Sequence, residues 1–320
     1  MNTRPAPAPG DSHAPASPAR TTLYLVDASL YVFRAWHSMP DDFRDADGWP
    51  TNAVHGFARF LLELIERARP QYIVVAFDEA LDSCFRNALY PAYKANRAPA
   101  PEELRRQFAQ CKALCTALGL TVLAHRDYEA DDLIGSALHM ARAHGHRGVI
   151  VSADKDLSQL LAEFDEQWDY ARGQRWGADG VMARQGVHAH QVADFLALSG
   201  DSVDNIPGVP GIGAKTAAHL LAHFGSLDAL LARIDEVGFL RFRGAAQAAA
   251  KLHLHREQAL LCRQLSTIAL DAPLCDAAPM FARGDCDRDQ LWALCEALRF
   301  GPMTRRRLHD AAGLEYAPAS

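Results

Sequence analysis

Three short apolar runs of the sequence each lead into aspartate. The carboxylates are Asp27, Asp78, Asp154 and, two positions later, Asp156, which follow the runs at residues 23–26, 72–77 and 149–151. A single aspartate after a strand also serves as a helix N-cap or a turn former. Open parallel sheets, however, bind ligands beyond the carboxyl ends of their strands, so three such runs would deliver carboxylates to one edge. The coincidence favours a functional site over three unrelated caps.

Two further acidic segments could join that edge. Glu129, Asp131 and Asp132 precede an amphipathic run, and Asp201 and Asp204 lie in the sequence Gly-Asp-Ser-Val-Asp-Asn. Acidic residues in a first helical turn commonly serve only as partners of the helix dipole. Three in four positions exceed what capping needs, and Glu129 and Asp132 are spaced to share one helix face. The 201–204 loop alone could be a polar turn, since it lacks the length and closing glutamate of an EF-hand.

If these segments converge, nine carboxylates share one pocket. Like charges at such distances raise one another's pKa and destabilise the fold, and bound divalent cations would compensate. Ligands that are all oxygen favour magnesium or manganese over zinc. Two such ions would activate water and stabilise the leaving oxygen in phosphodiester hydrolysis. The acidic set therefore predicts a two-ion centre that holds Mg²⁺ or Mn²⁺.

A glycine-rich segment at residues 206–216 follows the acidic loop directly. It reads Ile-Pro-Gly-Val-Pro-Gly-Ile-Gly-Ala-Lys-Thr and contains Gly208, Gly211, Gly213 and Lys215. The glycines allow a turn to present backbone amides, and the helical run that follows supplies a positive N-terminal end. Such a hairpin binds a phosphodiester backbone without reading bases. The glycine-to-lysine spacing does not fit a P-loop, whereas a purely structural hairpin stays an alternative.

Basic and aromatic residues alternate between the second apolar run and the acidic helix. They are Arg86, Tyr90, Tyr93, Lys94, Arg97, Arg105 and Arg106. This mixture suits single-stranded nucleic acid, because the charges contact phosphates and the rings stack on bases. An ordinary solvated helix face is the alternative for any one of them.

The elements that must position these residues are short apolar runs alternating with helical patterns. This alternation predicts an α/β protein whose mainly parallel central sheet is flanked by helices. The length of 320 residues and the hydrophobic content of 49% allow one large domain with a smaller module.

Charge, hydropathy and cysteine content limit the functional classes. The formal net charge of -6 argues against a generally basic nucleic-acid binder but allows a local basic surface. No apolar run approaches the roughly 18–20 residues of a membrane span, and the first twenty residues lack the apolar centre of a signal peptide. The seven cysteines form no CxxC unit, which argues against zinc. We therefore expect a cytoplasmic protein with free thiols and no membrane partner.

The motifs, taken in order, resemble the 5′-nuclease (flap endonuclease) family. They are LYLVDAS, VVAFD, CFRNALYPAYKANRAP, YEADDL, SADKDLSQLL and LSGDSVDNIPGVPGIGAKTA. The resemblance is to the 5′→3′ exonuclease domain of bacterial DNA polymerase I, and it runs from about residue 22 to near residue 310. No polymerase segment follows, so we expect a free-standing version.

The resemblance also implies a division of the chain. A PIN-like α/β catalytic domain is expected at residues 21–185, including a helical arch at about 81–106. A helical C-terminal domain with a helix–hairpin–helix is expected at residues 186–310. Residues 1–20, rich in proline and alanine, and residues 311–320 are expected to be tails, the first of them disordered.

The resemblance assigns roles to individual residues. It implies one metal site from Asp27, Asp78, Glu129 and Asp131, and a second from Asp132, Asp154, Asp156, Asp201 and Asp204. It implies that a 5′ strand threads the arch, where the residues that position the scissile phosphate are Lys94 and Arg97. Further DNA contacts are expected from Arg86, Tyr93, Gly208, Gly211, Gly213 and Lys215. The family's hairpin often binds a potassium ion, here through the backbone carbonyls of Leu198, Ser199, Pro207, Val209 and Ile212.

The expected function is therefore that of a monomeric, structure-selective DNA 5′ nuclease of replication and repair, acting on flaps, nicks or RNA-primed 5′ ends. Ala28 replaces the glycine that usually follows the first aspartate in the family. Asp201 and Asp204 are kept, which favours an active enzyme over a degenerate binder. A PIN-like ribonuclease and a non-catalytic protein that binds branched DNA are the alternatives.

Overall fold

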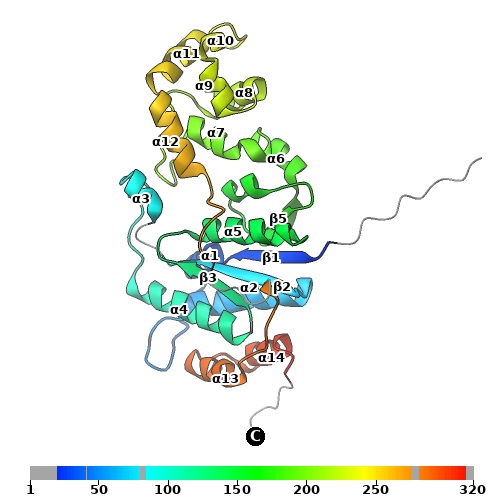
Figure 1. Ribbon diagram of the computed structural model, residues 1–320. Coiled ribbons are helices and arrows are strands. Elements are labelled where there is room, and N and C mark those ends of the chain that lie inside the picture. Colours follow the sequence, from blue (N-terminus) through cyan, green and yellow to red (C-terminus); the bar gives the residue numbers. More distant parts are fainter. Residues whose placement is uncertain (1–19, 41, 80–83, 275–280, 315–320) are drawn as a thin grey trace, which may run out of the picture.

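A six-stranded sheet of order β3-β2-β1-β4-β5-β6 organises the computed structural model, which describes residues 20–40, 42–79, 84–274 and 281–314 (Figure 1). The strands are β1 (Thr22–Asp27), β2 (Tyr72–Asp78), β3 (Thr121–His125), β4 (Arg147–Val151), β5 (Glu166–Asp169) and β6 (Gln174–Trp176). Strands β1 to β5 pair in parallel, and only β6 runs antiparallel to its neighbour. The predicted α/β class with a mainly parallel sheet is confirmed.

Helices cover both faces of this sheet. The helices of the α/β part are α1 (Ala28–Ser38), α2 (Asn52–Ala68), α3 (Phe85–Leu89), α4 (Glu102–Ala117), α5 (Ala130–Ala143) and α6 (Ala178–Gln185). Because successive side chains of a strand point to opposite faces, Leu23 and Leu25 of β1 pack with α5, whereas Val26 packs with α1 and α2. The central strand β1 is thus buried on both sides, as its apolar sequence requires.

Further helices extend the layer on the α5 side. They are α7 (Val192–Ser199), α8 (Ala214–Phe224), α9 (Leu227–Ala232), α10 (Ile234–Val237), α11 (Ala245–Leu254) and α12 (Arg256–Ser266). Helix α7 packs against both α8 and α12, and their buried side chains form one continuous core with those of α5. Helices α7 and α8, with the turn at residues 200–213 between them, form the expected helix–hairpin–helix.

The last two helices return to the opposite side of the molecule. Helices α13 (Arg288–Ala297) and α14 (Pro302–Ala311) pack against α4 and α2 and share the core on that face of the sheet (Figure 1). The approach is reinforced by a β-bridge between Tyr72 and Ala282. Residues 186–310 therefore include two helices that pack on the α/β part, and the expected division into domains stays a prediction. Leu291, Cys295 and Leu308 are buried against the α/β part.

The expected arch contains little helix. Its described part, residues 84–101, which we call the arch segment, consists of the short helix α3 and a series of turns before α4 begins. Residues 81–83 of the expected arch lie outside the described residues, as do the expected tails except for Arg20 and residues 311–314. Every described helix is too short or too polar to cross a bilayer, and the six described cysteines carry free thiols.

Candidate functional site

The strand order places the strand-end aspartates side by side. Strand β1 lies between β2 and β4, so Asp27 at the end of β1 is flanked by Asp78 at the end of β2 and by the segment after β4. Ser152 Oγ donates to Asp27 Oδ2 at 2.8 Å, which ties the β4 end to β1. Asp78 Oδ1 accepts the backbone N–H of Ala130 at 2.8 Å, which ties β2 to the start of α5. The acidic turn of α5 is thereby brought to the same edge.

Five carboxylates at this edge have raised pKa values. Burial is the main cause in each, and it raises the pKa of Asp27 to about 7 with help from the charge of Asp78. The pKa of Asp156 is raised to about 7 by burial and by the charge of Asp154. The pKa values of Asp78, Asp131 and Asp154 are raised by burial and by the other carboxylates. In the described part of the chain, Asp27, Asp78, Asp131 and Asp154 have no ion-pair partner.

Three of the remaining four carboxylates are paired with cationic side chains close to this edge. Lys94 Nζ contacts Glu129 Oε1, Arg97 Nη2 donates to Asp204 Oδ1 at 2.6 Å, and Lys155 Nζ donates to Asp201 Oδ2 at 2.9 Å. Burial disfavours the charged forms of Glu129 and Asp201, but the adjacent lysines hold both pKa values below the usual range. Lys155 was not predicted from the sequence, although it lies between Asp154 and Asp156.

These residues fit a divalent cation in charge and in donor chemistry. The ligands are carboxylate oxygens, which hard cations such as Mg²⁺ prefer, and the mutual repulsion of the unpaired aspartates is what a cation would relieve. As the described side chains stand, no three acidic, histidine or cysteine residues are arranged to hold one ion. Glu129, Asp201 and Asp204 are turned toward their lysine and arginine partners instead. Rotation of these side chains is therefore required before several carboxylates can contact one ion.

The raised pKa values predict how pH and metal act together on stability. An aspartate titrates near pH ~4 in an unfolded chain, whereas Asp27 and Asp156 titrate at about 7 when folded. Their contribution to stability is fully present below pH ~4 and is lost as the pH rises toward 7, because the folded protein holds the extra protons. A cation binds the ionised forms and restores the loss. We expect the rise in Tm caused by Mg²⁺, measured by calorimetry, to be at least about twofold larger at pH 8 than at pH 5.5. Equal rises at both pH values would contradict this.

Asp132 does not face this group of carboxylates. Its side chain is fully buried and forms a bidentate ion pair with Arg86, whose two terminal nitrogens donate at 2.8 and 2.7 Å. Asp132 also accepts the backbone N–H groups of Glu129 and Ala269. Glu129 is the N-cap of α5 and has an extended backbone, so the helical spacing expected to align it with Asp132 does not apply. The structure therefore gives no support to Asp132 as a metal ligand.

Arg86 is likewise removed from solvent, with only 3% of the residue exposed. Besides Asp132, its guanidinium donates to Glu129 Oε2 at 3.1 Å and to the carbonyl oxygens of Leu265 and Thr267. This ion-paired cluster joins α3, the start of α5 and the end of α12. In this conformation the guanidinium of Arg86 is buried and holds Glu129 Oε2, and the expected contact of Arg86 with DNA stays a prediction.

The arch segment is attached to the acidic loop at residues 201–204. The backbone N–H of Lys94 donates to Asp204 O at 3.0 Å, and Asn205 Nδ2 donates to Ala92 O at 2.6 Å. Tyr93 is buried and its hydroxyl donates to Glu129 Oε2 at 2.9 Å, so its ring is not available to stack on a base. Lys94 adopts a positive φ of 53°. The expected functional residues Lys94 and Arg97 thus point at carboxylates of both the sheet edge and the loop.

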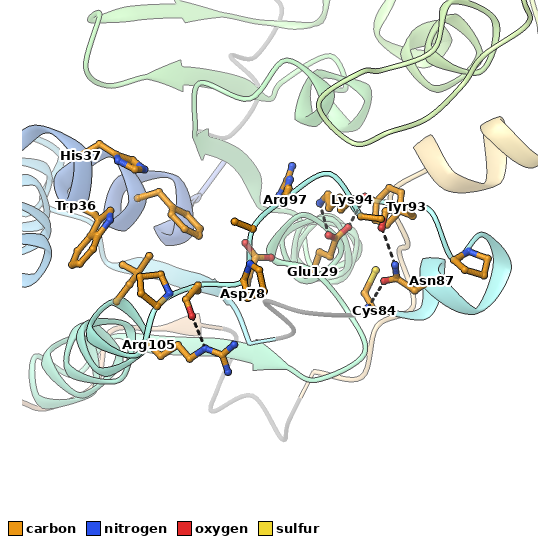
Figure 2. Close-up of a pocket in the computed structure, with 18 residues that line it drawn as sticks. Trp36, His37, Asp78, Cys84, Asn87, Tyr93, Lys94, Arg97, Arg105 and Glu129 are labelled. Carbon is orange, nitrogen blue, oxygen red and sulfur yellow. Dashed lines mark hydrogen bonds and ion pairs between the residues drawn. The ribbon is translucent and has the colours of Figure 1, made fainter.

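A cavity of about 940 Å³ opens beside the carboxylates. Figure 2 shows Trp36 and His37 of α1 on one side and Tyr93 and Lys94 of the arch segment on the other, with Asp78 between them. Its volume is that of a ligand-binding cleft. The cavity therefore connects solvent with the site, and it is lined by aromatic and basic side chains.

The hairpin at residues 200–213 depends on two glycines that approach each other. Gly200 and Gly208 both have positive φ, and a Cβ atom on Gly208 would lie 2.3 Å from the backbone nitrogen of Gly200. Leu198 O accepts the N–H of Val209, and Val209 O accepts that of Ile212, both at 2.9 Å. Each carbonyl keeps a second lone pair, so the expected potassium site stays a prediction.

Helices α11 and α12 support the hairpin in a way that the sequence did not indicate. Gln258 Nε2 of α12 donates to Gly208 O at 2.6 Å, and Lys251 Nζ of α11 lies 3.4 Å from Gly211 O. Gly211, Gly213 and Lys215 are exposed on the hairpin and the first turn of α8. These three residues are therefore accessible to a phosphate backbone.

The close approach of the Gly208 backbone to Gly200 predicts different losses of stability for two glycine substitutions. Gly208→Ala should lower the free energy of unfolding by roughly 1–3 kcal/mol, because a positive φ and a backbone clash must both be accommodated. Gly213→Ala should change it by less than about 0.5 kcal/mol, because Gly213 has a negative φ and open space around it. Urea unfolding of both variants measures the difference, and equal losses would contradict the role of Gly208.

The fold has counterparts among solved structures. T5 5′-exonuclease with bound zinc ions aligns over 92% of this chain and 99% of that chain, with a TM-score of 0.63 and 19% identity. The catalytic core of Rad2 in complex with DNA substrate aligns over 90% of this chain and 91% of that chain, with a TM-score of 0.60 and 15% identity. The fold is therefore the one shared by these nucleases.

Two family models cover most of the sequence. The 5′-3′ exonuclease N-terminal resolvase-like domain matches residues 22–187, and the 5′-3′ exonuclease C-terminal SAM fold matches residues 187–289. The chain belongs to the 5′-3′ exonuclease family.

Curated relatives show the same likeness. DNA polymerase I of Pseudomonas aeruginosa is 41% identical over 283 residues, which are 88% of this chain and 31% of that protein. DNA polymerase I of Bacillus subtilis is 34% identical over 300 residues, which are 92% of this chain and 33% of that protein. The chain thus spans about a third of the length of these relatives.

Proposed function

We propose that the protein is a structure-selective DNA 5′ nuclease that hydrolyses phosphodiester bonds at 5′ flaps, nicks and 5′ ends during replication and repair. One observation carries the proposal. Mutually repelling aspartates at the sheet edge lie beside the loop of Asp201 and Asp204, which leads directly into a hairpin that exposes Gly211, Gly213 and Lys215. The T5 flap endonuclease, which has a similar fold, is described in complex with DNA and metal ions.

The ligands of two divalent cations would come from the edge and the loop. We assign Asp27, Asp78, Glu129 and Asp131 to one ion, and Asp154, Asp156, Asp201 and Asp204 to the other. Bound Mg²⁺ or Mn²⁺ would supply positive charge to the phosphate and activate water. A potassium ion at the hairpin remains a prediction.

The basic side chains change partners in this proposal. In the structure, Lys94 and Arg97 are paired with Glu129 and Asp204. When those carboxylates serve as metal ligands, the ammonium and guanidinium groups are free to donate to the scissile phosphate, and charge-assisted bonds of this kind are the strong ones. The cavity between α1 and the arch segment offers the substrate strand a path to that point.

One assay tests the proposal against its alternatives. A 5′-labelled DNA flap is incubated with Mg²⁺ or Mn²⁺ beside single-stranded RNA of the same length, and product lengths are read. We expect the flap to be cut and the RNA to be cut far more slowly. Preferential cleavage of RNA would indicate a PIN-like ribonuclease. Tight binding of branched DNA without turnover in either metal would indicate a non-catalytic binder.

A further inference from the structure

We propose that the loop between α10 and α11, residues 238–244, is a second contact surface for duplex DNA, beyond the hairpin. The inference rests on the proposed function in that the ligand is DNA. It concerns a part of the chain remote from the carboxylates. Three exposed residues carry it, namely Phe239, Arg241 and Arg243.

Three side chains of this loop, those of Phe239, Arg241 and Arg243, extend into solvent. Phe239 is 88% exposed, the largest exposed fraction among the large hydrophobic residues described. Neither Arg241 nor Arg243 has a hydrogen bond or an ion pair with any residue that the structure describes. Arginines elsewhere in the same helical layer are engaged: Arg233 pairs with Glu236, and Arg263 pairs with Asp228.

The nearby acidic residues of α10 contact other side chains and not the arginines of the loop. Asp235 accepts from His253, and Glu236 is the partner of Arg233. In a chain of formal net charge -6, two unpaired guanidinium groups beside an exposed ring form a local positive surface. A phosphate backbone is complementary to it, because arginine donates bidentately to phosphate oxygens.

Two helices connect this loop with the hairpin. At the hairpin end, Lys251 of α11 lies 3.4 Å from Gly211 O. At the loop end, the ring of Phe242 packs against His219 of α8, with 5.1 Å between the ring centroids. His219 is four positions after Lys215, so both lie on one face of α8. The hairpin, this face and the loop therefore form one continuous surface, and Figure 1 shows α8 to α11 gathered at the end of the molecule far from α13 and α14.

The dimensions agree with one duplex lying on both sites. Residues 245 and 251 are six positions apart on α11, which spans about 9 Å at about 1.5 Å per residue. This length corresponds to about two to three base pairs of DNA at about 3.4 Å each. A duplex held by its backbone at the hairpin would thus reach Arg241 and Arg243 a few pairs further on, and the ring of Phe239 would offer apolar surface to its sugars.

Binding without catalysis tests the inference. Fluorescence anisotropy measures Kd in EDTA at several salt concentrations, with a flap substrate whose duplex is long enough to cover the loop and with a single strand alone. For Arg241→Ala/Arg243→Ala we expect Kd for the flap to rise on the order of tenfold at 0.1 M salt and the slope of log K against log salt to fall by about 1.8. Phe239→Ala should raise Kd a few-fold and leave that slope unchanged. Binding of the single strand should stay near the wild-type value.

The matched control is Arg288→Ala/Arg306→Ala, which removes two exposed arginines from α13 and α14 and should leave Kd unchanged. Wild-type affinity of the loop variant for the long duplex would overturn the inference, as would an equal defect with the single strand. Neither result bears on Mg²⁺-dependent cleavage by the wild-type protein, which decides the proposed function separately.

Discussion

Asp154→Asn should lower kcat for flap cleavage by about 10³-fold or more and leave Kd for DNA in EDTA within about twofold of the wild type. The amide keeps the shape of the side chain but removes the charge that a divalent cation needs. Asp154 has no ion-pair partner in the described chain, and its pKa is raised by burial and by neighbouring carboxylates. Its side chain accepts the backbone N–H of Asp156, which the amide oxygen of asparagine can also accept. Single-turnover cleavage of the labelled flap in Mg²⁺ measures the loss.

The control for this prediction is Asp179→Asn, which neutralises an exposed acidic residue in the first turn of α6 and should leave kcat unchanged. Asp131→Asn supplies a second readout. It should lower kcat as Asp154→Asn does, yet raise the Tm of the metal-free protein by about 2–4 °C, because a buried repelling charge is removed. Cleavage at the wild-type rate by both variants would refute the assignment of the edge carboxylates.

Arg86→Ala should lower the free energy of unfolding by about 3–5 kcal/mol. The substitution leaves Asp132 charged and fully buried, and it removes donors from Glu129, Leu265 O and Thr267 O. Urea unfolding measures the effect. Arg97→Ala, whose side chain is 51% exposed, is the control and should cost less than about 1 kcal/mol.

The double variant Arg86→Met/Asp132→Leu separates two causes of the lost stability, namely the unpaired buried charge and the volume of the missing side chain. Because no unpaired charge remains, we expect it to recover much of the stability lost in Arg86→Ala. Arg86→Lys should recover little, since an ammonium cannot reproduce the planar donor geometry of the guanidinium. If Arg86→Ala had wild-type stability but bound DNA more weakly, the result would instead support the direct contact between Arg86 and DNA that the family resemblance implied.

The carboxylates at the sheet edge could be predicted from the sequence because the signals are local. Apolar runs that end in aspartate predict the strands β1 and β2 and place the aspartates at the carboxyl-end edge of the sheet. The sheet order then brings Asp27 and Asp78 together. The signal of the hairpin glycines is equally local, since the positive φ at Gly208 and Gly211 favours glycine, which has no Cβ atom. The parallel class, the glycine-rich hairpin and the acidic set all follow from such short-range patterns, whereas the helix–hairpin–helix was implied by the family resemblance.

Contacts between distant segments were decided only by the tertiary structure. The spacing of Glu129 and Asp132 predicted that both lie on one helix face. In the structure, Arg86 and the backbone N–H of Ala269 hold the carboxylate of Asp132 in the interior. Arg86 itself is held by the carbonyl of Leu265, which is 179 positions further along the chain. The ion pair of Lys155 with Asp201 and the packing of α13 and α14 against α4 and α2 are also contacts between segments far apart in the sequence. The periodicity of a segment reports which face is apolar and not which partner covers it. The sequence by itself therefore determined the strand-end aspartates and the hairpin, and packing decided which acidic residues are paired with basic side chains and which are not.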